Sequence, residues 1–333
     1  MRIRRRIPPA RFLGACAATL PRVLRDRWRR GPRRPGWDLG FEWLVAALRR
    51  DVEGIWRHSP REIRRHFERL ARPSAWLRGV RIEPARAKDV AVAWFEPPDP
   101  MPGRVLLHFR GGAFQYGSIE TNAAHVAALA TLSNVTALAV DYRLAPEHPW
   151  PAALEDARTV WRWLVDHHVE SRHIVVCGES AGGNLALATL QALRDSGAPL
   201  PAGAALVSPW LDLAASAASY ERNADSDWGS REMLLAQARA YAGSLPLDDP
   251  RVSPGRGDPR RLPPLLVQCG SAELLFDECV EFATRAREAG VDVVLEVLPE
   301  MPHAAPLFGD LVREGARGRF DIARFVRARL SDE

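Results

Sequence analysis

The sequence predicts an α/β protein with a mostly parallel β-sheet that is covered by helices on both faces. Short apolar runs alternate along the chain with segments of helical periodicity, and this alternation is typical of parallel sheets. The chain has 333 residues, which suffices for one large domain or two smaller ones. An apolar fraction of 47% and a charged fraction of 26% are ordinary for a globular enzyme.

The apolar runs give the order of the expected elements. Helices are expected at residues 121–132, 152–164, 278–289 and 320–330, and another begins after Ser180. Right-handed crossovers between the strands then leave few topologies. Strands are expected at residues 90–95, 105–109, 137–142, 174–177, 204–207, 265–269 and 291–297.

Two stretches do not follow the alternation. Residues 37–77 are helical and rich in tryptophan, and residues 211–261 are rich in Ser, Asp, Pro and Gly, with a helix near 232–241. Because 211–261 is too long for a simple turn, we expect both stretches to cap the carboxyl edge of the sheet. The alternative is ordinary surface helices and a long loop. The predicted division is a basic arm at 1–36, a helical cap at 37–80, and a catalytic domain at 81–333 whose second cap segment is 211–261.

The charge of the chain is unevenly distributed. Residues 1–34 contain twelve Arg and a single acid, Asp26, so their balance is +11. The total of 46 basic and 41 acidic side chains then leaves 34 basic and 40 acidic ones, or −6, for the rest. The net charge of +5 therefore originates in the N-terminal arm.

The arm allows two interpretations. It is either a solvated, partly disordered tail or a peripheral contact with anionic lipid or another acidic partner. No nucleic-acid-binding module follows it, so no nucleic-acid partner is expected. The apolar run at 12–20 is short and is followed at once by Arg22 and Arg25, so we expect no cleaved signal peptide. No run of 18 apolar residues occurs.

The four cysteines, Cys16, Cys177, Cys269 and Cys279, have no metal-binding or redox spacing. Cys177 and Cys269 end apolar runs, which favours buried free thiols and a reducing cytoplasm. We therefore expect a cytoplasmic protein, and the cysteine spacing predicts no metal site. An oligomer is compatible with the sequence, but no motif specifies one.

A nucleophilic serine is the clearest chemical signal. Gly178-Glu-Ser180-Ala-Gly182 follows a predicted strand and opens a helix, which is the setting of a nucleophile elbow. A sharp strand-to-helix turn exposes the serine oxygen, and the helix N-terminus supplies positive potential beside the reacting carbonyl. This setting predicts the α/β-hydrolase fold.

A base and an acid should follow the serine in that fold, in the order Ser, acid, His. His303 is the only histidine beyond residue 262 and lies in the loop after strand 291–297, so we expect it to be the base. The acid should follow strand 265–269, where Glu273 and Asp277 both qualify. We favour Glu273, because Asp277 could instead be the N-cap of the helix that begins there.

Backbone donors are needed for the negative oxygen that develops on the substrate. The N–H of Ala181, directly after the nucleophile, is one candidate. Gly111 and Gly112 follow the strand at 105–109, and their N–H groups are the other candidates because glycine permits close backbone approach.

Several segments together resemble the hormone-sensitive-lipase-like esterases, also called the bacterial group IV esterases. Gly-Glu-Ser-Ala-Gly-Gly-Asn at 178–184 is similar to the family elbow, and the similarity spans roughly residues 88–330. Further matching segments are Arg-Gly-Gly-Ala-Phe-Gln-Tyr-Gly-Ser at 110–118, Asp-Tyr-Arg-Leu-Ala-Pro-Glu-His at 141–148, Pro-Ala-Ala-Leu-Glu-Asp at 151–156, Ser-Pro-Trp-Leu-Asp at 208–212 and Leu-Pro-Pro-Leu-Leu at 262–266.

The resemblance implies an eight-stranded sheet, a helical cap and cofactor-free hydrolysis of carboxylic esters with short or medium acyl chains. It assigns Ser180, Glu273 and His303 to the triad. Relatives include lactone hydrolases and deacetylases of small natural products, so these are alternative activities on a small-molecule substrate. A non-catalytic receptor on the same fold is the alternative from another class, although such receptors lose a triad member.

Two positions depart from the family pattern. Arg110 stands where the family usually has the histidine that shapes the loop, and Glu273 stands where the acid is usually Asp. Three nearby charged residues, Asp141, Arg143 and Asp156, are expected together with Tyr142 to be structural partners that hold the loops beside the elbow.

Overall fold

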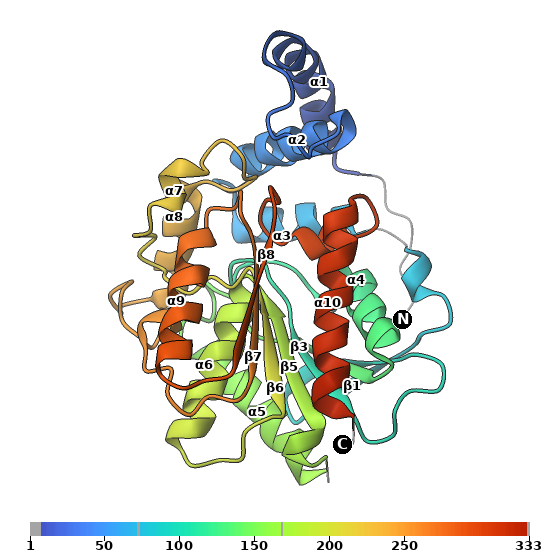
Figure 1. Cartoon of the computed structure of the whole chain (residues 1–333), viewed down its shortest axis with the longest axis vertical. Coiled ribbons are helices and arrows are strands. Elements are labelled where there is room, and N and C mark those ends of the chain that lie inside the picture. The colour runs from blue at the N-terminus through green and yellow to red at the C-terminus, as the bar shows by residue number, and fades with distance from the viewer. Residues whose placement is uncertain (1–7, 72–73, 168, 332–333) are drawn as a thin grey trace.

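The computed structural model describes residues 8–71, 74–167 and 169–331. Its strands form an eight-stranded sheet in the order β1-β2-β4-β3-β5-β6-β7-β8 (Figure 1). The pairs β1–β2 and β2–β4 are antiparallel, and the pairs from β4–β3 through to β7–β8 are parallel. The strands are β1 Arg81–Ala87, β2 Val90–Glu96, β3 Val105–Phe109, β4 Thr136–Asp141, β5 Ile174–Glu179, β6 Gly203–Val207, β7 Leu265–Gly270 and β8 Val293–Leu298.

Helices cover both faces of the sheet, as the alternating pattern predicts. Helices α4 and α10 pack on one face, and α5, α6 and α9 pack on the other. Successive residues of each buried strand point to opposite faces of the sheet. Leu106 therefore packs on the side of α4 and α10, and Leu107 packs on the side of α5, α6 and α9. The helices are α1 Ala10–Arg30, α2 Leu39–Ile55, α3 Pro60–Leu70, α4 Ile119–Ser133, α5 Ala152–Asp166, α6 Ala181–Asp195, α7 Ser219–Arg222, α8 Arg231–Ala242, α9 Phe276–Glu288 and α10 Arg313–Leu330.

Strand β1 does not correspond to any strand expected from the sequence. Its residues, Arg-Ile-Glu-Pro-Ala-Arg-Ala, are mostly exposed, because β1 is the edge strand and pairs only with β2. An edge strand needs no apolar run, so hydrophobic periodicity does not reveal it.

The interpretation of the arm as a solvated, partly disordered tail does not hold for residues 10–30, which form α1 and pack on α2. This helix buries Ala15, Thr19 and Val23, four residues apart, against α2. The indole N–H of Trp43 on α2 also donates to the carbonyl of Cys16 at 2.9 Å. Residues 1–7 of the arm lie outside the described residues. Within the described residues, no helix combines the length and the apolar character that crossing a bilayer requires.

Candidate active site

Ser180 lies in a sharp turn between β5 and α6. Its backbone is in the left-handed region at φ +57° and ψ −119°, a strained conformation for a side-chain-bearing residue. The N–H of Ser180 donates to Val207 at 2.9 Å, and its carbonyl accepts from Trp210 at 3.0 Å. A Cβ on Gly182 would lie 2.0 Å from the carbonyl oxygen of Phe109, so only glycine fits there. The sequence motif thus folds as an elbow, and Ser180 lines a pocket.

The structure brings Glu273 and His303 together. His303 Nδ1 lies 3.3 Å from Glu273 Oε2, and the Glu273 side chain is fully buried. Burial alone would lower the pKa of His303, but the facing carboxylate of Glu273 outweighs it, and the pKa is raised. Burial raises the pKa of Glu273 itself. His303 also lines the pocket onto which Ser180 opens.

Asp277, the alternative acid, has a different role. It lies in the first turn of α9, whose N-cap is Leu275, so the expectation that Asp277 caps this helix is wrong. Its carboxylate pairs with Arg222 of α7, with a distance of 3.1 Å between Nη1 and Oδ2. This ion pair is partly exposed to solvent, and the acid that faces His303 is Glu273.

Asp227 is a buried acid of the segment 211–261 that the sequence analysis did not identify. Its Oδ1 accepts the N–H of His303 at 3.0 Å, and its Oδ2 accepts the N–H of Leu274 at 2.8 Å. One carboxylate therefore holds the loop of the candidate base and the loop of the candidate acid. The neighbouring Trp228 donates its indole N–H to the carbonyl of His303 at 3.1 Å.

Asp227→Asn is expected to shift the acid limb of the kcat/KM profile to lower pH. The charge of Asp227 helps to raise the pKa of His303, and only the neutral imidazole can accept a proton, so a lower pKa preserves the base at lower pH. Weaker positioning of the two loops should also lower the maximal kcat/KM by roughly ten- to hundredfold. The check is a pH profile with p-nitrophenyl butyrate. Asp225→Asn is the matched control, because the side chain of Asp225 is 95% exposed. An acid limb that stays in place would contradict the electrostatic role.

The loop after β3 carries the candidate oxyanion donors. The N–H of Gly111 donates to Glu179 Oε1 at 2.7 Å, so the prediction that Gly111 is an oxyanion donor is wrong. Ala113, two residues later, lines the pocket beside Ser180. Among the described residues, no acceptor is found for the N–H groups of Gly112, Ala113 and Ala181. A Cβ on Gly112 would lie 2.0 Å from the carbonyl oxygen of Tyr116, so this turn also requires glycine.

Arg110 holds this loop from within. Its guanidinium is buried, contacts Asp141 Oδ1 at 3.0 Å and donates to the carbonyls of Tyr116 and Tyr142 at 3.2 and 3.3 Å. It also lies 4.3 Å from the centre of the Tyr142 ring, whose hydroxyl donates to the carbonyl of Arg110 at 2.7 Å. Arg110 thus joins both ends of the loop to Asp141 at the end of β4 and to Tyr142 directly after it. These contacts fit a residue that shapes the loop.

Arg143 and Asp156 are partners, as the sequence analysis expects. The backbone N–H of Arg143 donates to Asp156 Oδ2 at 2.8 Å, and the guanidinium contacts Oδ1 at 2.8 Å. The Arg143 guanidinium also reaches the carbonyl of Ala152 at 3.0 Å. These contacts fasten the segment after β4 to the start of α5.

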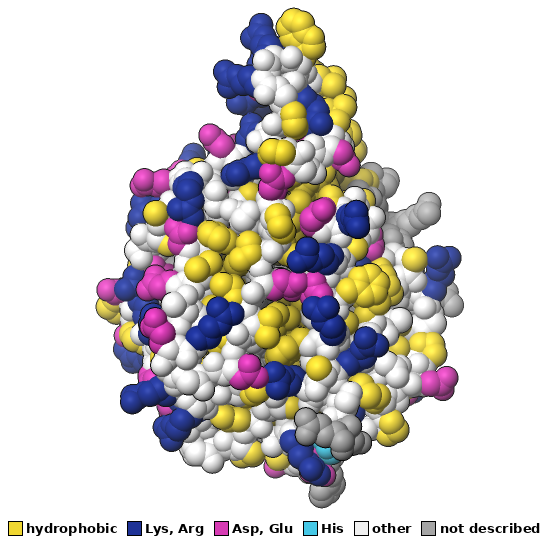
Figure 2. Space-filling view, viewed as in Figure 1, with side chains coloured by type: hydrophobic (Ala, Val, Ile, Leu, Met, Phe, Trp, Pro, Cys, Tyr) yellow, Lys and Arg dark blue, Asp and Glu magenta, His cyan; other side chains and the backbone are white. Residues whose placement is uncertain are grey.

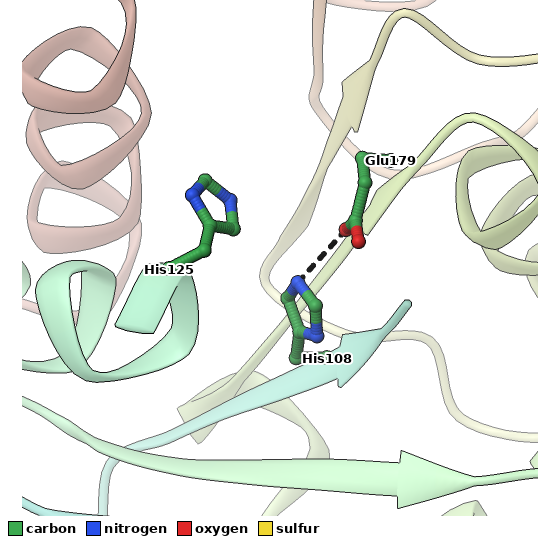
Figure 3. Close-up of side chains that lie close together, drawn as sticks. All are labelled: His108, His125 and Glu179. Atoms are coloured by element: carbon green, nitrogen blue, oxygen red, sulfur yellow. Dashed lines mark ion pairs between the residues drawn. The ribbon is translucent and has the colours of Figure 1, made fainter. Parts of the chain in front are cut away.

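A buried group of His108, His125 and Glu179 lies directly behind the elbow (Figure 3). Two imidazoles and a carboxylate are donors that zinc and related ions accept. His108 Nε2 lies 2.9 Å from Glu179 Oε2, and the other oxygen of Glu179 accepts from Gly111 and Asn122. These contacts already engage the carboxylate and fit a role in shaping the loop of Gly111. Burial lowers the pKa of His125 to about 3, so its ring is neutral.

A second group with possible metal ligands contains Cys269, Glu273 and Cys279. Burial raises the pKa of the Cys279 thiol, which disfavours the thiolate that a metal would need. Glu273 also faces His303, so the two cysteines are better explained as side chains that pack around this carboxylate. The free thiols of Cys177 and Cys269 are buried, as their positions at the ends of apolar runs predict, and the thiol of Cys279 is buried as well.

The pocket in front of Ser180 contains about 350 Å³ of space not filled by atoms, part of it open to solvent. Its polar lining consists of Ser180, Asp227, Gln237 and His303. Much of the remaining wall is apolar and comes from the loop after β3, the segment 211–261 and the turn before α9. These wall residues are Ala113, Tyr116, Trp228, Gly229, Met233, Leu234, Leu274 and Leu275.

Comparison with known proteins agrees with this geometry. A profile for a family described as having the alpha/beta hydrolase fold matches residues 106–307. An acetyl-hydrolase from Streptomyces hygroscopicus is 39% identical over 232 residues, which cover 68% of this chain and 76% of the relative. An ethyl acetate hydrolase from Pseudomonas putida is 32% identical over 297 residues, covering 81% and 90%.

Solved structures place the chain more narrowly. An esterase from the bacterial hormone-sensitive lipase family superposes with a TM-score of 0.82 at 34% identity, covering 86% of this chain and 97% of that one. The chain therefore belongs to the α/β-hydrolase fold family and, within it, to the hormone-sensitive-lipase-like esterases.

Proposed function

We propose that the protein hydrolyses carboxylic esters with short or medium acyl chains through a triad of Ser180, Glu273 and His303. The observation that carries this proposal is the position of His303. Its imidazole faces a fully buried carboxylate on one side and lines the pocket of Ser180 on the other. That arrangement fits a base whose tautomer and orientation are fixed by an acid.

In the first half of the reaction, the Ser180 hydroxyl attacks the ester carbonyl while His303 takes its proton. The carboxylate of Glu273 stabilises the imidazolium that results. The negative oxygen of the tetrahedral intermediate accepts hydrogen bonds from the N–H groups of Gly112, Ala113 and Ala181, which have no acceptor among the described residues.

In the second half, collapse of the intermediate breaks the ester C–O bond, and the alcohol leaves with the proton from His303. Water then attacks the acyl group on Ser180, again with His303 as the base, and the acid product departs. Each proton that His303 accepts is returned, so the enzyme ends in its starting form.

The acyl-chain preference follows from the pocket. Met233 and Leu234 of α8 form the wall of the pocket on the side of segment 211–261. We assign this segment, together with residues 37–80, to the cap. The apolar side chains of Met233, Leu234, Leu274 and Leu275 lie in the wall around Ser180, which suits a short acyl group better than a palmitoyl chain. The names of the relatives, which act on acetyl groups and ethyl acetate, support the same preference.

The proposal is tested with p-nitrophenyl esters from acetate to palmitate. We expect kcat/KM for butyrate to exceed that for palmitate by at least roughly 10²-fold, because the cap limits the pocket. A fluorophosphonate should label the wild type and leave Ser180→Ala unlabelled. Absence of both ester hydrolysis and labelling would overturn the esterase assignment. Faster cleavage of lactones or acetamides at the same serine would instead favour the lactonase or deacetylase alternative.

A further inference from the structure

Helix α1 has a second apolar face in addition to the one buried against α2. Leu13, Leu24 and Trp28 are 50%, 46% and 86% exposed, and Trp28 is the most exposed large hydrophobic side chain of the described residues. Together with the exposed Ala17 and Pro21 they are spaced by three or four residues, so they form one stripe along the helix. Ala15, Thr19 and Val23 occupy the opposite, buried face.

Arginines accompany this stripe. Helix α1 contains six Arg and one acid, Asp26, which gives a balance of +5. Arg22, Arg25, Arg29 and Arg30 are exposed next to Leu24 and Trp28. Figure 2 shows basic and hydrophobic side chains mixed on the projection that α1 forms at one end of the molecule. An exposed tryptophan among arginines is the composition of a helix that lies in the headgroup region of a bilayer.

The projection is attached to the end of the molecule that carries the pocket. Helix α2 lies between α1 and the body (Figure 1). Arg49 of α2 donates to the carbonyl of Ala224 at 2.6 Å, and Arg57, just after α2, pairs with Glu232 at 3.0 Å. These two partners flank the pocket residues Asp227 and Trp228. The stripe is therefore held by a packed helix pair near the pocket.

We propose that α1 is an interfacial helix that docks this end of the protein onto a bilayer containing anionic phospholipid. The stripe of Leu13, Leu24 and Trp28 enters the boundary between headgroups and acyl chains, and the arginines pair with headgroup phosphates. A nucleic acid would use the arginines but would leave the apolar stripe exposed to water. The combination of arginines and an apolar stripe therefore favours a lipid bilayer over a nucleic acid as the partner of α1.

The docking is tested by cosedimentation of the full chain with phosphatidylcholine vesicles that contain none or about 30% phosphatidylglycerol. We expect binding to the anionic vesicles only, weakened by about tenfold or more when salt rises from roughly 50 to 500 mM. Leu24→Ser/Trp28→Ser and a variant with Gln at Arg22, Arg25, Arg29 and Arg30 should each lower vesicle binding by about tenfold or more.

Two control variants change exposed side chains elsewhere on the surface. Val294→Ser/Phe320→Ser removes exposed apolar groups of β8 and α10, and the charge control places Gln at Arg251, Arg260, Arg317 and Arg324. Both controls should bind vesicles like the wild type. Hydrolysis of p-nitrophenyl butyrate in solution should be unchanged in every variant, since none of these residues lines the pocket.

Three results would overturn the docking. The first is a wild type that does not bind anionic vesicles. The second is equal loss of binding in a control variant. The third is a Leu24→Ser/Trp28→Ser protein that binds as well as the wild type, which would show a site for polyanions in general.

Discussion

Replacing Ser180 by alanine is expected to lower kcat/KM for p-nitrophenyl butyrate by roughly 10⁵- to 10⁶-fold. The change removes the only atom that would form the covalent bond, while the pocket and the candidate oxyanion donors remain. A residual rate of about 10³ over that in water should persist for this reason. Steady-state kinetics with a highly purified protein measures the loss, and thermal unfolding checks that the elbow still folds.

The double variant Ser180→Ala/His303→Ala sharpens this test. If the serine and the histidine act as one unit, each single change already removes the function of the other, so the double variant should be about as active as either single one. Losses that multiply would mean that His303 acts independently of Ser180, and the assigned triad would be wrong.

Glu273→Gln is expected to lower kcat by about 10⁴-fold with little change in KM. Glutamine fills the same volume but carries no charge, so it neither stabilises the imidazolium nor fixes the tautomer of His303. Asp277→Asn is the matched control, because it removes the other candidate acid, which contacts Arg222 instead. We expect kcat of Asp277→Asn to stay within about threefold of the wild type, since a partly exposed ion pair contributes little.

The opposite result would reassign the acid. If Asp277→Asn lost activity and Glu273→Gln kept it, the loop would have to rearrange in solution so that Asp277 faces His303. A thermal unfolding curve for each variant separates a chemical effect from a folding defect, because Glu273 is fully buried and its replacement can also affect stability.

The central strands were predictable from the sequence because they are buried on both faces and therefore form continuous apolar runs. Strand β1 was not, since an edge strand with an exposed face needs no such run. Helix α1 was misjudged for a different reason. Its many arginines suggested a solvated tail, whereas the few residues that pack on α2, such as Ala15 and Val23, decide its structure.

The candidate site also contains residues that the sequence predicts and residues that it does not. Chain order after successive strands was enough to select Ser180 and His303, and also Glu273 as the preferred acid. The direction in which a backbone N–H points cannot be predicted from the sequence. Gly111 was therefore chosen as a donor although its N–H contacts Glu179. Asp227 was missed because it lies in an irregular Ser- and Asp-rich loop, 46 residues before Glu273, where no periodicity marks a buried acid.

The hydrogen bonds of Asp227 also bear on how this scaffold can be re-engineered. Segment 211–261 lines the pocket, so exchanging it between relatives is the obvious route to a new specificity. Asp227, however, also anchors the loops of Glu273 and His303, at Leu274 and at the His303 N–H. A transplanted segment without an acid at this position would change the geometry of catalysis along with the substrate range. Chimeras of these enzymes should therefore keep Asp227 and Trp228 together with the loops of Glu273 and His303, and exchange only the residues from Gly229 onward.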